Sequence, residues 1–223
     1  MIHVMSTGDE DERRVRIADL ILRFRRAGIT DQHVLQAIES VPRDVFVPAE
    51  SRADAYAERA LPIDCGQTIS APLIVGMMTA ALDLGARDRV LEIGTGTGYQ
   101  AAVLSRLCQR VYTIDRFRTL IAAAESRFRT LRITNITTLL GDGTRGWPEQ
   151  SPFDRIIVTA AGEAVPEPLL TQVRIGGILV APVGPWDGVQ KLLRIERTDT
   201  GYETKNLADV RFVPLIPGKA ERL

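Results

Sequence analysis

The chain has 223 residues, enough for one α/β domain with a single hydrophobic core and an N-terminal addition. Its 28 Lys and Arg residues balance its 28 Asp and Glu residues, so no strong net field favours nucleic acid or an anionic membrane as a partner. The acidic start, the lack of a membrane-length apolar run and only two cysteines, too few for a disulfide framework, lead us to expect a cytoplasmic protein without leader or anchor.

The N-terminal part of the chain predicts a helical cap in front of the main domain. Residues 1–12 are polar and acidic, and we expect them to form a disordered tail. Apolar residues at helical spacing predict one helix over residues 12–26. A second helix is predicted to start at Thr30 as its N-cap and to stop before Pro42. With a short helical stretch near residues 51–57, the cap covers residues 13–65.

A loop rich in special residues joins this cap to the rest of the chain. It spans residues 61–72, and residues 73–84 follow as a largely apolar helix that we expect to be buried. Ser70 is a candidate cap for that helix. Pro72 suits the first turn, because an N–H group there has no intrahelical partner anyway.

Strands and helices alternate after residue 88, which predicts right-handed crossovers and a parallel sheet covered on both faces. The predicted strands are residues 89–93, 111–114, 137–140, 155–159 and 178–183. The predicted helices are residues 99–107, 118–131 and 166–173. Two further runs, residues 189–197 and 202–215, flank a turn signal at residues 199–201 and predict an antiparallel pair at the sheet edge.

The fold class that follows is α/β, with a doubly wound, mostly parallel sheet of seven strands. We expect residues 13–223 to form a single domain. Within it, the helical extension is followed by a ligand-binding core over residues 66–185 and by antiparallel strands over residues 186–223.

A glycine-rich loop follows the first predicted strand of the sheet. Gly94, Gly96 and Gly98 stand at every second position, just before an apolar helix pattern. Glycines remove side chains where a ligand must approach the backbone closely. The spacing is G-x-G-x-G, whereas dinucleotide folds use G-x-G-x-x-G, so it favours an S-adenosylmethionine (SAM) pocket. A glycine-rich turn that binds no ligand is the alternative.

Three acidic residues stand at or just after the ends of three predicted strands. Ligands of open α/β sheets bind beyond the carboxyl ends of the strands, so these acids are candidate ligand contacts. Glu92 is placed to receive the ammonium of the ligand, directly or through water. Asp115 is placed to accept both ribose hydroxyls, and Asp142 to accept from the adenine amino group. Each acid alone fits a helix cap or solvated loop equally well; three together favour binding.

Motifs for hydrolytic chemistry are missing from the sequence. It contains two histidines, His3 in the expected tail and His33 at an expected surface position, and it has neither a zinc-type histidine motif nor a G-x-S-x-G motif. We therefore expect no metal. Methyl transfer to a carboxylate fits this set of residues, because a group with a pKa of about 4 is already ionised at neutral pH and needs no base.

Several segments of the chain together resemble the protein-L-isoaspartate O-methyltransferase family. The resemblance runs from residue 41 to about residue 215. Residues 66–72 resemble a signature of this family that general SAM enzymes lack, and residues 91–99 resemble its cofactor loop. The other matching segments are residues 41–48, 141–143, 146–147, 152–161, 176–184 and 212–215.

The resemblance implies a Rossmann-like fold and methylation by SAM of the free α-carboxylate of L-isoaspartyl residues. Its partners would be damaged proteins, whose methyl ester closes to a succinimide that reopens partly to aspartate. We expect a monomer that binds neither nucleic acid nor membranes.

The resemblance also implies roles for individual residues, with Ser70 as the catalytic residue beside the accepting carboxylate. Together with the residues already discussed, those expected at the cofactor are Thr68, Ile69, Ser70, Glu92, Gly94, Thr95, Gly96, Gly98, Asp115, Arg116, Asp142 and Gly143. Those expected at the isoaspartyl peptide are Ile69, Ser70, Ala71, Val213, Pro214 and Leu215.

The chain departs from the family pattern at residues 64–65, at Asp115, where glutamate is common, and after residue 215. Three other functions remain open. One is a SAM enzyme with a small-molecule or nucleic-acid acceptor, although no Asn-Pro-Pro-aromatic motif of base methylation occurs. The second is a non-catalytic module that binds SAM or proteins. The third, a nicotinamide dehydrogenase, is disfavoured by the glycine spacing.

Overall fold

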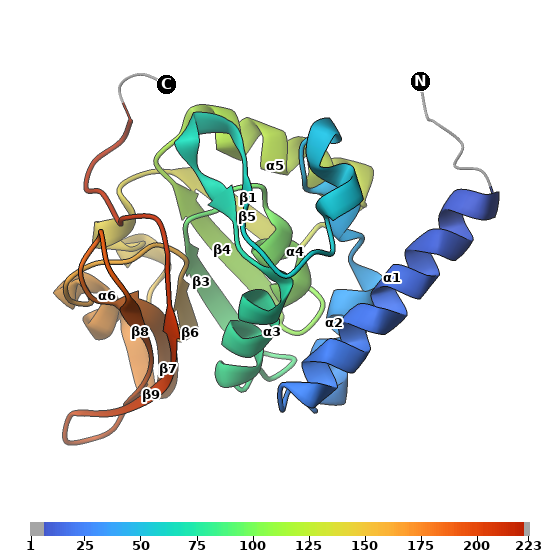
Figure 1. The fold of residues 1–223 in the computed structure, drawn as a ribbon. Coiled ribbons are helices and arrows are strands. Elements are labelled where there is room, and N and C mark those ends of the chain that lie inside the picture. Colours follow the sequence, from blue (N-terminus) through green and yellow to red (C-terminus); the bar gives the residue numbers. More distant parts are fainter. Residues whose placement is uncertain (1–6, 221–223) are drawn as a thin grey trace.

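The computed structural model describes residues 7–220 and centres on a seven-stranded sheet (Figure 1). The strand order is β5-β4-β3-β6-β7-β8-β9. The strands are β3 (Arg89–Ile93), β4 (Arg110–Asp115), β5 (Ile136–Leu140), β6 (Phe153–Val158), β7 (Val173–Val183), β8 (Gln190–Arg197) and β9 (Tyr202–Val210). Strands β3 to β7 pair in parallel, and β8 is antiparallel to both β7 and β9. The predicted doubly wound sheet with an antiparallel C-terminal edge is confirmed.

Helices cover both faces of this sheet. They are α1 (Thr7–Arg26), α2 (Gln32–Ser40), α3 (Pro72–Ala81), α4 (Tyr99–Leu104), α5 (Arg118–Thr130) and α6 (Glu167–Gln172). Successive strand residues point to opposite faces. In β3, Val90 therefore packs in a cluster with residues of α1 to α5, while Leu91 and Ile93 pack in the cluster that contains Leu169 of α6. No helix within residues 7–220 is long and apolar enough to cross a membrane.

Helix α1 begins earlier than the sequence predicts. The expected tail is wrong over residues 7–12, which form the start of this helix. Acidic residues near a helix N-terminus and ion pairs one turn apart favour helix. Arg14 pairs with Asp11, and Arg16 pairs with Glu12. Residues 1–6, including His3, lie outside the described residues.

The two predicted helix caps are wrong, each for a different reason. Asp31, rather than Thr30, caps α2 and accepts from the backbone N–H of His33 at 2.8 Å. Helix α3 starts at Pro72 after Ala71, without a side-chain cap. Residues just before it form β2 (Thr68–Ile69), which pairs with β1 (Leu61–Pro62) and keeps the loop extended. Ser70 is therefore not the cap residue.

Strand β9 is shorter than the predicted run over residues 202–215. It ends at Val210, and the chain then leaves the sheet edge and crosses to the end of β6 (Figure 1). There the N–H of Ala161 donates to the carbonyl of Val213 at 2.8 Å, and the N–H of Leu215 donates to the carbonyl of Ala161 at 2.7 Å. This crossing places residues 213–216 beside the carboxyl ends of the parallel strands.

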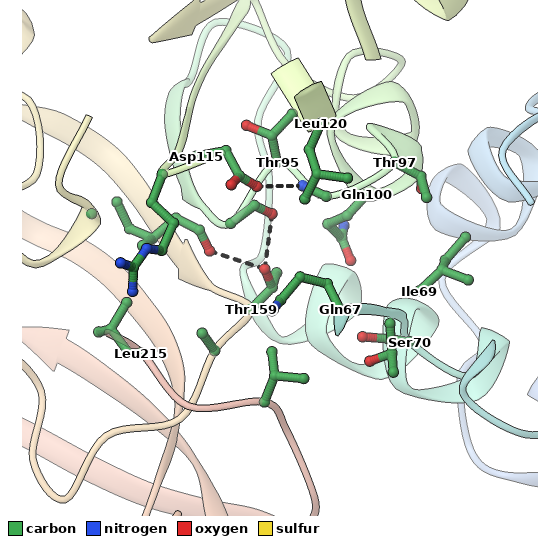
Figure 2. A pocket seen from close by; sticks show the side chains of 18 of the residues that line it. Gln67, Ile69, Ser70, Thr95, Thr97, Gln100, Asp115, Leu120, Thr159 and Leu215 are labelled. Carbon is green, nitrogen blue, oxygen red and sulfur yellow. Dashed lines mark hydrogen bonds between the residues drawn. The ribbon is translucent and has the colours of Figure 1, made fainter. Parts of the chain in front are cut away.

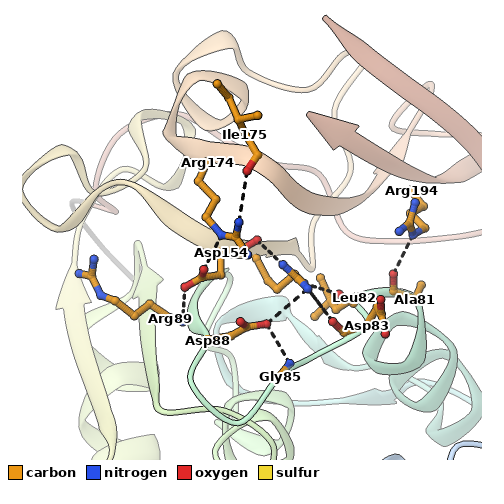
Figure 3. Close-up of polar contacts among 11 residues, drawn as sticks. Ala81, Leu82, Asp83, Gly85, Asp88, Arg89, Asp154, Arg174, Ile175 and Arg194 are labelled. Carbon is orange, nitrogen blue, oxygen red and sulfur yellow. Dashed lines mark hydrogen bonds and ion pairs between the residues drawn. The ribbon is translucent and has the colours of Figure 1, made fainter. Parts of the chain in front are cut away.

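The C-terminal end of α3 is held by two arginines from the sheet (Figure 3). Arg155 of β6 donates from Nε to the carbonyl of Leu82 at 2.6 Å and from Nη2 to that of Asp83 at 2.7 Å. Arg194 of β8 donates to the carbonyl of Ala81 at 3.2 Å. The last carbonyls of a helix lack intrahelical partners and attract cations. The sheet thereby positions α3, whose other end follows Ser70.

Replacing Arg155 with methionine is expected to lower the free energy of unfolding by about 3 kcal/mol, because it leaves Asp88 and two helix-end carbonyls without their buried partner. Urea unfolding followed by circular dichroism measures the loss. Arg14→Met is the control, since its ion pair is exposed and is expected to contribute less than about 0.5 kcal/mol. Equal losses in the two variants would contradict the anchoring role of Arg155.

Candidate functional site

A pocket lies at the carboxyl ends of β3, β4 and β6 (Figure 2). It encloses about 970 Å³ when its open mouth is included. In the close-up, Asp115 lies toward one end, and Ile69 and Ser70 lie toward the other. Its lining includes residues from the loop before α3, the glycine loop, the end of β4, the end of β6 and the crossing C-terminal segment. Segments far apart in the sequence thus meet at one site.

The three glycines after β3 have positive φ angles but different surroundings. A Cβ on Gly94 would lie 2.3 Å from Oγ1 of Thr159, which donates to the carbonyls of Ile93 and Gly94. A Cβ on Gly98 would lie 2.7 Å from the ring of Phe128. Gly96, at φ +52°, meets only a side-chain atom at 3.9 Å and lines the pocket. Gly98 is therefore required by helix packing and does not line the pocket, whereas Gly94 and Gly96 do.

Asp115 lies at the end of β4 and lines the pocket, with 7% of its surface exposed. Its Oδ2 accepts from the N–H of Gly96 at 2.8 Å, and its Oδ1 accepts from the N–H of Phe117 at 2.9 Å. Burial raises the pKa of this carboxyl, and these N–H groups oppose the rise. Each carboxylate oxygen keeps acceptor capacity for hydroxyl groups of a ligand.

Glu92 lies behind the pocket wall instead of on it. Its side chain is fully buried, and it is not among the lining residues. Thr113 Oγ1 donates to Glu92 Oε2 at 2.5 Å and lies 2.7 Å from Oγ1 of Thr95, which does line the pocket. Oε1 of Glu92 has no hydrogen-bond partner among the described residues. Glu92 thus reaches the pocket through two threonine hydroxyls.

The acidity of Glu92 makes a testable contribution to stability. Burial raises its pKa to about 8 from an ordinary 4.5. Between about pH 5 and pH 8, Glu92 is ionised in the unfolded chain but still protonated in the folded protein. The free energy of unfolding therefore falls progressively as the pH rises through this range. Glu92→Gln is expected to remove this part of the pH dependence, on the order of 3 kcal/mol by pH 7. Parallel pH profiles of the two proteins in urea unfolding would contradict a buried proton at this position.

Asp142 caps a short turn, which was the alternative to ligand binding that its sequence position also allowed. It precedes a 3-10 turn over Gly143–Arg145, and its Oδ1 accepts from the N–H and the hydroxyl of Thr144 at 2.9 and 2.7 Å. Burial tends to raise the pKa of Asp142, but the bonds from Thr144, the N–H of Gly218 and the charge of Arg145 hold it below the ordinary value. Asp142 is not among the lining residues, but Gly143 is.

The remaining predicted residues lie at the pocket with one exception. Those that line it are Thr68, Ile69, Ser70, Arg116, Val213, Pro214 and Leu215. Ala71 does not line it and precedes α3. The Ser70 hydroxyl has no hydrogen-bond partner among the residues described, while its carbonyl accepts from Nη2 of Arg43 at 2.6 Å. The hydroxyl is therefore free to bind a ligand.

Sequence reasoning missed several residues of the pocket. They are Gln67, Val75, Met78, Ile93, Thr97, Tyr99, Gln100, Ile114, Phe117, Leu120, Thr159, Ala160 and Ile216. The position of Thr159, directly after β6, is a signal of the same kind that singled out the acids. For the apolar members, such as Leu120 of α5, the sequence carries no comparable signal, because they differ from core residues only in facing a cavity.

The fold and the pocket together define a SAM-dependent methyltransferase of the Rossmann-like class. A doubly wound sheet binds its ligand at the carboxyl edge, and here that edge carries close backbone approach at Gly96 and a buried carboxylate at Asp115. Both features fit an adenosyl ligand, whose ribose offers two hydroxyls.

Comparison with known proteins identifies the family within this class. Residues 15–220 match the family model described as protein-L-isoaspartate(D-aspartate) O-methyltransferase (PCMT). A protein-L-isoaspartate O-methyltransferase of Paracoccus denitrificans is 56% identical over 210 residues, covering 94% of this chain and 97% of the relative. One from Parvibaculum lavamentivorans is 54% identical over 213 residues, covering 95% and 96%. The chain belongs to the protein-L-isoaspartate(D-aspartate) O-methyltransferase family.

Solved structures agree with this assignment. A protein-L-isoaspartate O-methyltransferase superposes with a TM-score of 0.81 at 29% identity, covering 89% of this chain and 65% of that longer chain. A putative member from Plasmodium falciparum, in complex with S-adenosyl-L-homocysteine, superposes with a TM-score of 0.76 at 23% identity, covering 89% and 97%. The second likeness concerns the fold alone.

Proposed function

We propose that this protein transfers the methyl group of SAM to the free α-carboxylate of L-isoaspartyl residues in damaged proteins, the first step of their repair. Membership in the family supports this activity. The observation that carries it in the structure is one pocket that brings together Asp115, the glycine loop and the free hydroxyl of Ser70. When bound, the cofactor supplies a methyl group activated by a sulfonium centre.

The cofactor side of the proposal assigns a task to each element at the carboxyl edge. Asp115 binds the two ribose hydroxyls, as charge-assisted hydrogen bonds favour. The backbone at Gly94, Thr95 and Gly96 lets the cofactor approach closely. Five further residues border the cofactor at the pocket wall: Thr68, Ile69, Ser70, Arg116 and Gly143. Glu92 acts on the cofactor from behind the wall, through Thr113 and Thr95. Gly98 shapes the loop after β3, and Asp142 shapes the loop after β5.

The acceptor side requires orientation more than acid or base chemistry. The acceptor carboxylate is ionised at neutral pH, since its pKa is about 4 in a peptide. Ser70 is the proposed catalytic residue, and its hydroxyl donates to the carboxylate and aims one oxygen at the methyl group. Ile69, Ala71 and residues 213–215 are the proposed contacts of the peptide, from the loop before α3 and from the crossing segment.

A direct test compares methyl transfer from labelled SAM to an isoaspartyl peptide and to the same peptide with ordinary aspartate. We expect labelling of the isoaspartyl peptide at least about a hundredfold above that of its twin, because the two place their carboxylates differently on the backbone. The labelled product is expected to be base-labile, as an ester is. Equal labelling of both peptides, or of neither, would contradict the proposal.

We further infer that the protein acts as a cytoplasmic monomer, and that one methyltransferase domain, which includes α1 from its start at Thr7, binds neither nucleic acid nor membranes. The balanced charge supports this inference. So do the two free thiols, Cys65 and Cys108, which suit a reducing compartment. Light scattering during gel filtration tests the oligomeric state.

A further inference from the structure

Arg43 is a buried arginine directly behind the loop that carries Ser70. It opens a 3-10 turn over Arg43–Val45 in the helical cap, and its surface is 0% exposed. Its Nε donates to the carbonyl of Ala55 at 2.7 Å, and its Nη2 donates to the carbonyl of Ser70 at 2.6 Å. Its guanidinium carbon lies 4.8 Å from the ring centroid of Tyr99, a residue of the pocket wall. One side chain therefore connects the N-terminal helical region, the Ser70 loop and α4.

The positive charge of Arg43 is not neutralised locally. No carboxylate within residues 7–220 forms an ion pair with it, and its Nη1 has no hydrogen-bond partner there. Glu58, the carboxylate with the largest influence on it, instead accepts from the N–H of Leu73 at 3.0 Å and pairs with Arg23. An arginine keeps its charge in proteins, and a buried charge without a counter-ion is costly. Residues 7–220 thus supply no compensating anion for this charge.

We propose that Arg43 is a positioning residue for the acceptor, which holds the Ser70 backbone from behind and favours an anionic group at the Ser70 hydroxyl. This inference rests on the proposed function. Its hydrogen bond places the guanidinium against the Ser70 backbone, and the low dielectric of the interior strengthens its attraction for a carboxylate in the pocket. Methyl transfer turns that carboxylate into a neutral ester, so the attraction acts on the substrate and is lost in the product.

A purely structural role for Arg43 would make a different prediction. Two carbonyl contacts alone would stabilise the loop without regard to the charge of the acceptor. Arg155 provides the matched comparison, because it is also buried and also donates to backbone carbonyls, but at the far end of α3 from Ser70. A charge effect at the acceptor should follow Arg43 and leave Arg155 variants unaffected.

The experiment measures binding of two labelled peptides to the protein saturated with S-adenosylhomocysteine. One peptide carries an isoaspartyl residue with its free α-carboxylate, and the other carries the neutral α-carboxamide in its place. We expect wild type to prefer the carboxylate by about tenfold or more. Arg43→Met should reduce this preference to less than about twofold, with the Kd of S-adenosylhomocysteine changed by less than about threefold. Arg43→Lys, which keeps the charge, should retain most of the preference.

Arg155→Met should keep the full preference even where it lowers the Tm as much as Arg43→Met does. A preference that survives in Arg43→Met, disappears equally in Arg155→Met, or is absent from wild type would overturn the role of Arg43. If Arg43→Met does not fold, Arg43→Lys decides, because loss of the preference there refutes the charge effect and retention supports it. Failure of wild type to methylate the isoaspartyl peptide would instead refute the proposed function.

Discussion

Replacing Asp115 with asparagine is expected to weaken binding of S-adenosylhomocysteine by about 10- to 100-fold. Hydrogen bonds to a charged group contribute about 1.5–3 kcal/mol each, and 1.4 kcal/mol corresponds to a tenfold change in Kd. The carboxylate of Asp115 already accepts from the N–H groups of Gly96 and Phe117 and still has acceptor capacity toward the pocket. An amide offers one oxygen in place of two, and its NH₂ group would face one of these N–H donors.

Isothermal titration calorimetry measures the change, and Asp209→Asn serves as the control. Asp209 also carries an ion-paired carboxylate, but it lies exposed on β9 and away from the pocket. We expect its variant to bind S-adenosylhomocysteine as wild type does. An unchanged Kd in the Asp115 variant would rule out the ribose assignment. Asp142→Asn provides a second comparison. Its side chain caps a turn and does not line the pocket, so we expect its variant to change the Kd by less than about threefold.

Replacing Ser70 with alanine is expected to lower kcat on the isoaspartyl peptide by about 10- to 100-fold, since a hydrogen bond to the charged acceptor is lost at the moment of transfer. Stability should change by less than about 0.5 kcal/mol, because the hydroxyl neither caps α3 nor bonds to any described residue. The loop itself stays in place through the Ser70 carbonyl, which accepts from Arg43.

Initial-rate kinetics with the labelled peptide measure this effect, together with the Kd of S-adenosylhomocysteine, which should stay within about threefold of wild type. Ser151→Ala removes an exposed hydroxyl that bonds to the carbonyl of Pro148 and should leave kcat unchanged. A Ser70→Ala protein with wild-type kcat would show that the acceptor is oriented by other groups, and the catalytic assignment would then fall.

The sheet was predictable because its signals are local in the sequence. Continuous apolar runs located β3, β4 and β6 to within two residues at each end, and Asp199 to Gly201 marked the turn between β8 and β9. The cap positions were less predictable. Thr30 and Asp31 are both good cap residues, and only the backbone path selects between them. At Ser70, pairing of β2 with β1 decided the outcome, and these strands are too short to have a periodic signal.

In the site, too, some features were predictable from the sequence and others were not. The sequence predicted a direct ligand contact for each of the three strand-end acids, but the structure separates them. Asp115 lines the pocket, Glu92 is buried one layer behind it, and Asp142 caps a turn. The direction of a side chain at a strand end depends on the twist of the sheet and on the neighbouring loop, which no local pattern encodes. Arg43 was not recognised at all, because a buried arginine has the same sequence appearance as a solvated one.

The sequence by itself determined the class of fold and the glycine loop, because both depend on residue types at short and regular spacing. The glycine spacing favoured SAM as the cofactor, and the family was indicated by resemblance of whole segments to known proteins. Tertiary structure alone decided which acid lines the pocket, where the C-terminal segment crosses to Ala161, and that the Arg43 charge lies behind Ser70 without a counter-ion among residues 7–220. These features join residues far apart in the chain. Their contacts depend on how helices and strands pack against each other, and packing is a property of the whole fold.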